Sequence, residues 1–216
     1  MFSEPYARHF DQFYHAKPYK RDIEFLWAWA HQPKRILDLG CGTAQYWRYY
    51  PPSVELVGID QSPEMIAHSP YKDRIFCHDL TTLDPWFQTK PVDCVTALFD
   101  VLNYLPHQAW WKYLPLKRDG YLLFDVWNTD QVRRDGFHPT VRMVNGCVRT
   151  ITPVEQTDHK VRLQIVLTSS TVNLTEVHDM YLYDFDDIVE CAGAEFDVLD
   201  VKRTDTWQMY YKLKRK

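Results

Sequence analysis

The sequence contains few glycines and no long apolar run. Seven glycines occur among its 216 residues. No apolar run reaches about 18 residues, the length that a membrane-spanning helix needs. The first residues, MFSEPYARHFDQFYH, include acids and histidines where a secretory signal peptide has a basic start and an apolar core. We therefore expect neither secretion nor insertion into a membrane.

The cysteines lack the spacing of a structural motif. Their number is odd, and no two of them form a Cys-x-x-Cys pair. This pattern predicts neither a disulfide framework nor a zinc knuckle, and a His-Glu-x-x-His metal motif is also missing. The sequence is typical of a reduced, cytoplasmic protein, and we expect no metal site. The cysteines are Cys41, Cys77, Cys94, Cys147 and Cys191.

The chain also lacks a strong excess of charge of one sign. It has 25 Lys and Arg against 29 Asp and Glu, a formal net charge of −4, whereas nucleic-acid-binding proteins usually present a basic surface. The one basic run, at residues 212–216, ends the chain, and a solvated end is its simpler interpretation. Apolar and charged fractions of 45% and 25% are those of a globular protein. We expect a single domain over residues 1–216 and no nucleic-acid partner.

Short apolar runs alternate with helical or loop segments in the first part of the chain. RILDLG (35–40) leads into a glycine turn, and VELVGID (54–60) leads into a segment where Ser62 is typical of a helix N-cap. Such repeated units predict an α/β fold with a parallel sheet and crossover helices. Further strands are expected at 74–79, 92–99 and 120–127, the last opened by an Asp119-Gly120 turn, and further helices at 44–50 and 107–114.

The pattern changes after residue 127. Segments 141–152, 160–170 and 171–184 alternate apolar and polar residues with a period of two, and turn-like pairs such as Asn145-Gly146 connect them. We expect an antiparallel β insert over residues 128–183 that caps the same domain. A helix ending near Gly193 and a terminal strand pair at 196–204 and 206–214 should follow.

Two of the scarce glycines, Gly40 and Gly42, lie at the end of the first strand. Glycines there let a ligand approach the backbone at the carboxyl edge of a parallel sheet, where open α/β sheets bind ligands. Asp60 closes the second strand, where such folds hydrogen-bond the ribose of an adenosine. A dinucleotide fingerprint needs a third glycine where this chain has Gln45, which disfavours an NAD-dependent oxidoreductase. Asp38 adds a carboxylate that can meet a cationic group.

The ordered motifs LDLGCGTAQYW, GIDQSPEMI, CHDL and VTALFDVLNYL resemble those of the class I S-adenosylmethionine-dependent methyltransferases. The resemblance covers most of residues 10–127. It implies a Rossmann-like, seven-stranded, mostly parallel sheet with helices on both faces, and the antiparallel cap inserted after the fifth strand. It also implies S-adenosylmethionine as the cofactor. The cofactor residues would be Asp38, Gly40 and Gly42 at the methionyl part, Asp60 at the ribose, Gln61 and Met65 beside the adenine, Asp79 and Leu80 at the adenine edge, and Phe99 beside the methionyl group.

Each of these residues also has a structural interpretation. The glycines can form a mere turn, Asp60 can cap a helix, and Met65 can fill the core. The N-terminal segment HFDQFYHAKPYKRDIEFL is similar to the opening of sugar N,N-dimethyltransferases, whose tyrosines close over the cofactor. Tyr14 and Tyr19 hold the matching places, so residues 1–30 are expected to form lid helices. The alternative is that these aromatic residues only pack a leading helix against the sheet.

Methyl transfer is an in-line displacement, so the site must align the acceptor, the methyl group and the sulfur and exclude water. By the resemblance, the segment after the fourth strand faces the sulfonium. Tyr104 stands there where some sugar dimethyltransferases have a histidine. The expected catalytic residues are Tyr104, His178, Asp100 and Tyr14, with His178 on the strand face of Glu176 and Met180, and the expected acceptor contacts are Asn103, His107, Asp125, Trp127 and Asn128.

The sequence thus predicts transfer of a methyl group to the oxygen or nitrogen of a small polar acceptor, such as a sugar or a nucleotide sugar. Two alternatives stay open. One is a methyltransferase that acts on a non-sugar small molecule, and the other is a catalytically silent subunit that keeps the fold and binds a partner protein. We expect the cap at residues 128–183 to cover the acceptor site. The resemblance also suggests the hypothesis that this cap forms a homodimer interface.

Overall fold

Seven strands form the main sheet, in the spatial order β10-β11-β5-β4-β1-β2-β3. Neighbouring strands are parallel except where β11 pairs with β5 and with β10. The Rossmann-like, mostly parallel sheet is therefore confirmed. The computed structural model describes residues 2–82, 90–106, 114–204 and 207–216. The strands are β1 (Arg35–Leu39), β2 (Glu55–Asp60), β3 (Ile75–Cys77), β4 (Val92–Ala97), β5 (Leu116–Trp127), β10 (Phe196–Arg203) and β11 (Gln208–Arg215).

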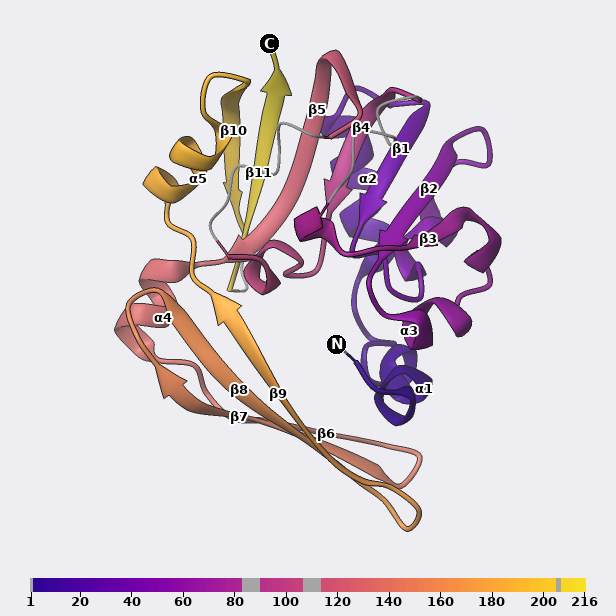
Figure 1. Cartoon of the computed structure of the whole chain (residues 1–216), viewed down its shortest axis with the longest axis vertical. Coiled ribbons are helices and arrows are strands. Elements are labelled where there is room, and N and C mark those ends of the chain that lie inside the picture. The colour runs from indigo at the N-terminus through magenta and orange to yellow at the C-terminus, as the bar shows by residue number, and fades with distance from the viewer. Residues whose placement is uncertain (1, 83–89, 107–113, 205–206) are drawn as a thin grey trace.

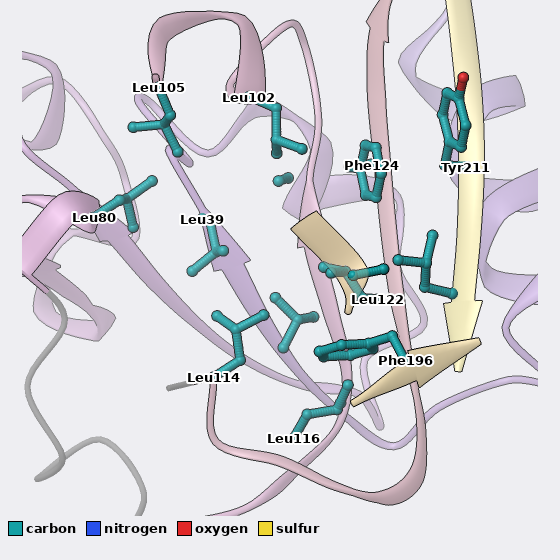
Figure 2. Packing of buried hydrophobic residues seen from close by; sticks show 14 of the residues in the cluster. Leu39, Leu80, Leu102, Leu105, Leu114, Leu116, Leu122, Phe124, Phe196 and Tyr211 are labelled. Atoms are coloured by element: carbon teal, nitrogen blue, oxygen red, sulfur yellow. The ribbon is translucent and has the colours of Figure 1, made fainter. Parts of the chain in front are cut away.

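Helices cover both faces of this sheet. Successive side chains of a strand point to opposite faces, so Ile36 packs with Ile23 and Leu26 of α2 on one face. Leu37 belongs to the cluster on the other face, together with Ile188 of α5. Figure 2 shows part of this second cluster, in which Leu122 and Phe124 of β5 point toward side chains of other segments. The helices are α1 (Glu4–Phe13), α2 (Tyr19–Trp29), α3 (Pro63–Ala67), α4 (Thr129–Asp135) and α5 (Phe185–Ala192), with short 3-10 turns η1 (Gln45–Tyr49), η2 (Lys72–Arg74), η3 (Leu80–Thr82) and η5 (Leu102–Tyr104).

A separate four-stranded antiparallel sheet follows β5 and forms the cap. It comprises β6 (Thr140–Val144), β7 (Cys147–Gln156), β8 (Lys160–Thr168) and β9 (Asn173–Tyr181). Its first hairpin turns at Asn145 and Gly146, whose φ angles of +50° and +74° suit a primed two-residue turn. In Figure 1 the cap sheet lies beyond the edge of the main sheet where the arrows of β1 and β2 end, and α1 lies close to both. The predicted insert is therefore present.

Three expectations about elements need correction. The strand expected at 120–127 begins at Leu116, and Asp119-Gly120 lies inside it as an irregularity, with a φ of +65° at Asp119. In the segment 44–50, only Gln45–Tyr49 is helical, as a 3-10 turn, and Ala44 has a left-handed φ of +58° that a right-handed helix cannot include. Helix α4, capped by the side chain of Asn128, was not expected. The helix expected at 107–114 lies almost entirely outside the described residues.

No helix in the described ranges is long and apolar enough to cross a membrane.

Candidate active site

A cavity of about 320 Å³ lies between the carboxyl edge of the main sheet, helix α1 and the inner face of the cap. Strand ends β1, β2, β4 and β5 supply one wall, α1 supplies a second, and β6 to β9 supply the third. The cavity brings together most of the residues singled out in the sequence. Those that line it are Tyr14, Tyr19, Asp38, Gly40, Gly42, Asp60, Gln61, Met65, Asp79, Leu80, Phe99, Asp100, Tyr104, Trp127 and His178.

The glycine turn after β1 forms part of the floor of the cavity. Gly40 has a φ of +59°, and a Cβ atom at this position would lie 2.5 Å from Cγ2 of Val101. Both the backbone angle and the close contact therefore require glycine. The N–H of Gly42 donates to Oδ2 of Asp60 at 2.7 Å. The turn and the end of β2 are thus joined by a hydrogen bond inside the site.

Asp60 is buried but keeps acceptor capacity for a ligand. Its Oδ2 accepts from Gly42 and its Oδ1 accepts from the N–H of Ser62 at 2.8 Å. A carboxylate offers about four lone-pair positions, so two remain for hydroxyl groups of a ligand. Burial raises the pKa of Asp60, while the two backbone donors oppose this rise. Ser62 caps α3 by accepting from the N–H of Met65, and Met65 is buried against the cavity.

Asp38 is a second buried carboxylate at the sheet edge. Its oxygens accept from Nε1 of Trp47 and from Oγ1 of Thr96, each at 2.7 Å. Burial raises its pKa to about 6. A cation in the cavity beside Asp38 would stabilise the ionised form and reverse this rise. Sequence reasoning did not assign roles to Trp47 and Thr96, although both lie inside the quoted motifs, because the sequence does not show that their side chains turn toward Asp38.

The backbone after β4 is held in a strained conformation. Phe99 and Asp100 have φ angles of +73° and +64°, which cost about 1–3 kcal/mol for each non-glycine residue and are typical of functional sites. Asp125 of β5 stabilises this turn, because its carboxylate accepts from the N–H of Phe99 at 2.6 Å and from that of Asp100 at 3.3 Å. The strained turn places both side chains in the wall of the cavity.

Asp100 and Asp125 form a carboxyl pair that Gln208 bridges. Nε2 of Gln208 donates to Oδ2 of Asp125 at 2.6 Å and to Oδ1 of Asp100 at 3.3 Å. Burial and the neighbouring Asp100 carboxylate raise the pKa of Asp125 to about 8. Burial also raises the pKa of Asp100, although a hydrogen bond with Trp127 opposes this. Two like charges so close cannot both ionise easily, so the pair holds a proton near neutral pH.

Aromatic rings from α1 and from the loop after it surround this turn. The ring of Tyr14 meets that of Phe99 edge-on, with 4.6 Å between their centroids. Nζ of Lys17 lies 4.7 Å from the centroid of Phe99. Tyr19 packs edge-on against Tyr46 at 4.9 Å. The N-terminal segment therefore contacts the turn after β4 through Tyr14 and Lys17, and contacts η1 through Tyr19.

Tyr104 and His178 face each other across the cavity. Their ring centroids are 5.6 Å apart. Burial raises the pKa of Tyr104 well above its ordinary value, so its phenol stays protonated at neutral pH and can donate a hydrogen bond but is a poor base. His178 lies on the strand face of Glu176 and Met180, as predicted, and its Nε2 is 3.0 Å from Oε2 of Glu176. Glu176 also accepts from the backbone N–H of Ser3 at 2.8 Å.

Three residues expected to contact the acceptor lie outside the cavity lining, and the expectation for them is corrected. Asn103 is fully buried, where it donates to the carbonyl of Tyr181 and accepts from the N–H of Trp127. Asp125 is engaged by the strained turn, and the side chain of Asn128 caps α4. In all three the side chain is bonded to backbone groups of neighbouring segments, and Asp125 also accepts from the side chain of Gln208. His107 lies outside the described residues.

Helix α1 is attached to the glycine turn by one acid. The carboxylate of Asp11 accepts from Oγ1 of Thr43 at 2.5 Å and also from Nε2 of Gln45. Gln45, which stands where a dinucleotide fingerprint has glycine, thus contacts the N-terminal helix. Sequence reasoning missed Asp11, because nothing in the sequence around it signals a contact more than 30 residues away.

The cap contributes two arginines that sequence reasoning also missed. Arg142 of β6 and Arg149 of β7 line the cavity. Period-two alternation could have placed Arg149 on the inner face with Cys147, which is also buried. Within the described ranges, no group of three or more His, Cys, Asp and Glu side chains is arranged to hold a metal ion.

A family model described as a methyltransferase domain matches residues 7–155. A putative methyltransferase of Geobacillus sp. (strain WCH70) is 32% identical over 148 residues, which make up 60% of this chain and 59% of that protein. The match therefore spans less than two thirds of the relative's length. Both comparisons point to the same family.

Two solved structures share the fold. An S-adenosylmethionine-dependent methyltransferase from Clostridium acetobutylicum superposes with a TM-score of 0.78 at 18% identity, over 98% of each chain. CalS10, an amino pentose methyltransferase of calicheamicin biosynthesis from Micromonospora echinaspora, was solved with S-adenosylmethionine bound. It superposes with a TM-score of 0.75 at 18% identity, over 100% of this chain and 98% of that one. At 18% identity, these superpositions show a shared fold.

Proposed function

The chain belongs to the family of methyltransferase domains, and we propose that it transfers a methyl group from S-adenosylmethionine to the nitrogen of an amino sugar. The observation that supports a nitrogen acceptor is the Asp100–Asp125 carboxyl pair, of which Asp100 lines the cavity and Asp125 lies behind it. The amino pentose methyltransferase of the same fold supports the choice of a sugar.

The residues at the sheet edge fit S-adenosylmethionine. Asp60 has two lone-pair positions left for the ribose hydroxyls, and Asp38, buried without a cationic partner among the described residues, would hold the ammonium group. Met65 and Leu80 provide apolar surface for the adenine. When bound, the cofactor supplies a methyl group on a positively charged sulfur. The residues of this chain would orient the cofactor and exclude water from the site.

The carboxyl pair suits an amine better than a hydroxyl. Asp125, whose pKa is raised to about 8, would hold the proton of the pair at neutral pH and leave Asp100 as the ionised carboxylate. Burial raises the pKa of Asp100 as well, which makes it a better match for an amino group, whose pKa is about 8 to 10. Asp100 would take the proton of the ammonium and leave a lone pair that attacks the methyl group, while Asp125 and Gln208 hold Asp100 in place. A sugar hydroxyl has a far higher pKa and would need a stronger base. His178, oriented by Glu176, is the second candidate for the proton acceptor.

Residues 1–30 act, in this proposal, as a lid. Helix α1 lies over the cavity, where Tyr6, Phe10 and Tyr14 line it. The contacts of Asp11 with the glycine turn would fasten the lid once the cofactor is bound. Closure of this kind excludes water, which strengthens the electrostatic interactions inside.

The cap would also form a homodimer in the cytoplasm. Its outer face exposes Val141 and Met143 of β6 and Val177 of β9. The five cysteines are free, which suits a reducing compartment. A single monomeric mass in light scattering at micromolar concentration would contradict the dimer.

Methylation assays test the proposed function. The purified protein is incubated with S-adenosylmethionine and either amino sugars or the matching neutral sugars, and S-adenosylhomocysteine and product mass are measured. We expect only the amino sugars to gain a methyl group. Asp100→Asn should lower kcat by about 100-fold or more and leave the affinity for S-adenosylhomocysteine unchanged.

Asp119→Asn is the matched control, because Asp119 is exposed and pairs with Lys214 far from the cavity. Methylation of the neutral sugars alone would mean an oxygen acceptor. If Asp100→Asn keeps full turnover, Asp100 is not the proton acceptor, and His178 becomes the candidate for that role.

A further inference from the structure

Arg142 and Arg149 of the cap lie directly opposite each other on neighbouring strands. The antiparallel register of β6 and β7 pairs them, and both line the cavity. Like charges at directly opposite positions destabilise a sheet. Neither guanidinium forms an ion pair with any Asp or Glu among the described residues. The arrangement has an electrostatic cost, and no carboxylate of the described chain offsets it.

Arg149 is buried with only neutral partners. Its side chain is 2% exposed. One terminal nitrogen donates to the phenol oxygen of Tyr6 at 3.3 Å, and the guanidinium carbon lies 4.7 Å and 5.1 Å from the ring centroids of Tyr14 and Phe13. Its Nε is buried and has no hydrogen-bond partner. A guanidinium always carries its charge and offers five donors, so a buried one without an anion is poorly satisfied.

Arg142 lies at the rim of the same site. It is exposed to solvent, and one terminal nitrogen donates to the carbonyl of Phe13 at 2.7 Å. Its guanidinium carbon is 5.2 Å from the ring centroid of Tyr14, the ring that Arg149 also contacts. The two guanidinium groups therefore contact the same ring, that of Tyr14. Arg149 is buried, whereas Arg142 is exposed at the rim of the cavity.

The charges of the cavity are separated along its length. Carboxylates come from the main sheet and the loops at its edge, and they include Asp38, Asp60 and Asp100, whereas the arginines come from the cap. Tyr14 contacts both Phe99 and Arg149. Only the side chain of Tyr14 therefore lies between Phe99, at the sheet edge, and Arg149 of the cap. A small molecule can span this separation.

We propose that Arg142 and Arg149 bind an anionic group of the acceptor, a phosphate or a carboxylate. This inference rests on the proposed function, because it assigns the amine of the acceptor to the Asp100 end and its anion to the cap. Guanidinium groups bind both anions through paired N–H donors. The acceptor is therefore an amine and an anion in one molecule, and a neutral amino sugar would leave Arg149 unpartnered.

The alternative is that Arg149 only anchors α1 through its aromatic contacts. The two interpretations differ in what a small anion does. The first probes are inorganic phosphate and acetate, titrated into the protein loaded with S-adenosylhomocysteine. We expect saturable binding of at least one of them, weakened by about tenfold or more in Arg149→Met and less in Arg149→Lys, which keeps the charge. Binding of neither anion, or equal binding by the wild type and Arg149→Met, would overturn the proposal.

Arg142→Gln keeps the test decisive if Arg149→Met fails to fold, because Arg142 is exposed. It should also weaken anion binding, by about threefold to tenfold. Arg134→Gln is the matched control, since Arg134 is an exposed arginine of α4 that pairs with Asp135 and should leave anion binding unchanged. Loss of binding in the control as well would mean a non-specific charge effect and would also overturn the proposal.

Amino sugars distinguish the source of the anion. Glucosamine, glucosamine 6-phosphate and glucosaminuronic acid are compared for binding and methylation. A preference for the phosphate or for the uronic acid identifies the anion, and Arg149→Lys should reduce that preference. Methylation of all three at equal efficiency would reject the anion site and leave the proposed function standing. Binding of the anionic sugars without methylation would support the anion site and contradict the proposed function.

Discussion

Gly40 shows how one residue joins the fold to the site. Its φ of +59° costs about 1–2 kcal/mol for a residue with a side chain, and its α-hydrogen faces Val101 where a Cβ would lie 2.5 Å away. Val101 follows the strained Phe99-Asp100 turn. The glycine turn and the turn after β4 are therefore packed in direct contact, so a change at one displaces the other.

We predict that Gly40→Ala lowers the free energy of unfolding by at least about 2 kcal/mol in urea denaturation. Gly146→Ala is the matched control, because Gly146 has a φ of +74° but nothing within 4 Å of a Cβ, so it should lose only the backbone part, about 1 kcal/mol. In a Val101→Ala background the cost of Gly40→Ala should fall toward that of the control. Equal losses in both glycine variants would show that the contact with Val101 is unimportant.

The proposed role of Asp38 predicts that the affinity for the cofactor depends on pH. Its pKa of about 6 is raised above the ordinary value, so the side chain is protonated below pH 6 and ionised above it. The ammonium group of S-adenosylhomocysteine favours the ionised form. We predict that its Kd is constant above about pH 7 and rises by up to tenfold per pH unit below 6. Asp38→Asn should bind weakly at every pH with a flatter profile, and a flat wild-type profile from pH 5 to 7 would refute the role.

At the scale of elements, α1 connects the main sheet to the cap. Asp11 binds the glycine turn, while the carbonyl of Phe13 accepts from Arg142 of β6. The N-terminal backbone at Ser3 donates to Glu176 of β9. One helix thus contacts both walls of the cavity, which is the arrangement that the proposed lid requires.

We predict that Asp11→Asn speeds the dissociation of S-adenosylhomocysteine by about fivefold to tenfold and changes unfolding by less than about 1 kcal/mol. The physical reason is that the amide loses one of the two charge-assisted hydrogen bonds to the glycine turn. Arg8→Gln, which removes an exposed ion pair on the same helix, should leave the dissociation rate unchanged. Stopped-flow measurement with both variants decides the matter; identical rates for Asp11→Asn and the wild type would show that this contact does not hold the lid.

Elements with local signals could be predicted from the sequence, and elements that depend on distant contacts could not. The strand β1, the Ser62 cap of α3 and the Asn145-Gly146 hairpin have their causes within a few residues. Helix α4 is short and polar, and it exists because Asn128 caps it and Val132 is buried under the cap. The Asn128 cap is a local signal, but Val132 is the one apolar residue that the helix buries, so the sequence shows no helical period there.

At the scale of the whole molecule, the same distinction applies to the site. Motifs at successive strand ends identified the carboxylates that line the cavity, since strand ends of a parallel sheet meet at one edge. Gln208 comes from the last strand and reaches Asp125 only because β11 pairs antiparallel to β5. The arginines come from the cap, whose position over the edge no local pattern specifies. Residues brought in by long-range pairing are the ones that sequence reasoning missed.

The whole molecule is therefore two sheets around one cavity, with acids on the main sheet and arginines on the cap. This division explains how the site could bind a cofactor with a cationic sulfur and ammonium at one end and an anionic acceptor at the other. The central claim of this account is that the sheet edge binds S-adenosylmethionine through Asp60.

Titration calorimetry with S-adenosylhomocysteine, beside NAD as the control ligand, tests that claim most directly. The account predicts saturable binding of S-adenosylhomocysteine alone, and a loss of about 1–3 kcal/mol of binding free energy in Asp60→Ala, because the ribose hydroxyls lose their buried acceptor. Binding of NAD, or unchanged affinity of Asp60→Ala for S-adenosylhomocysteine, would contradict it.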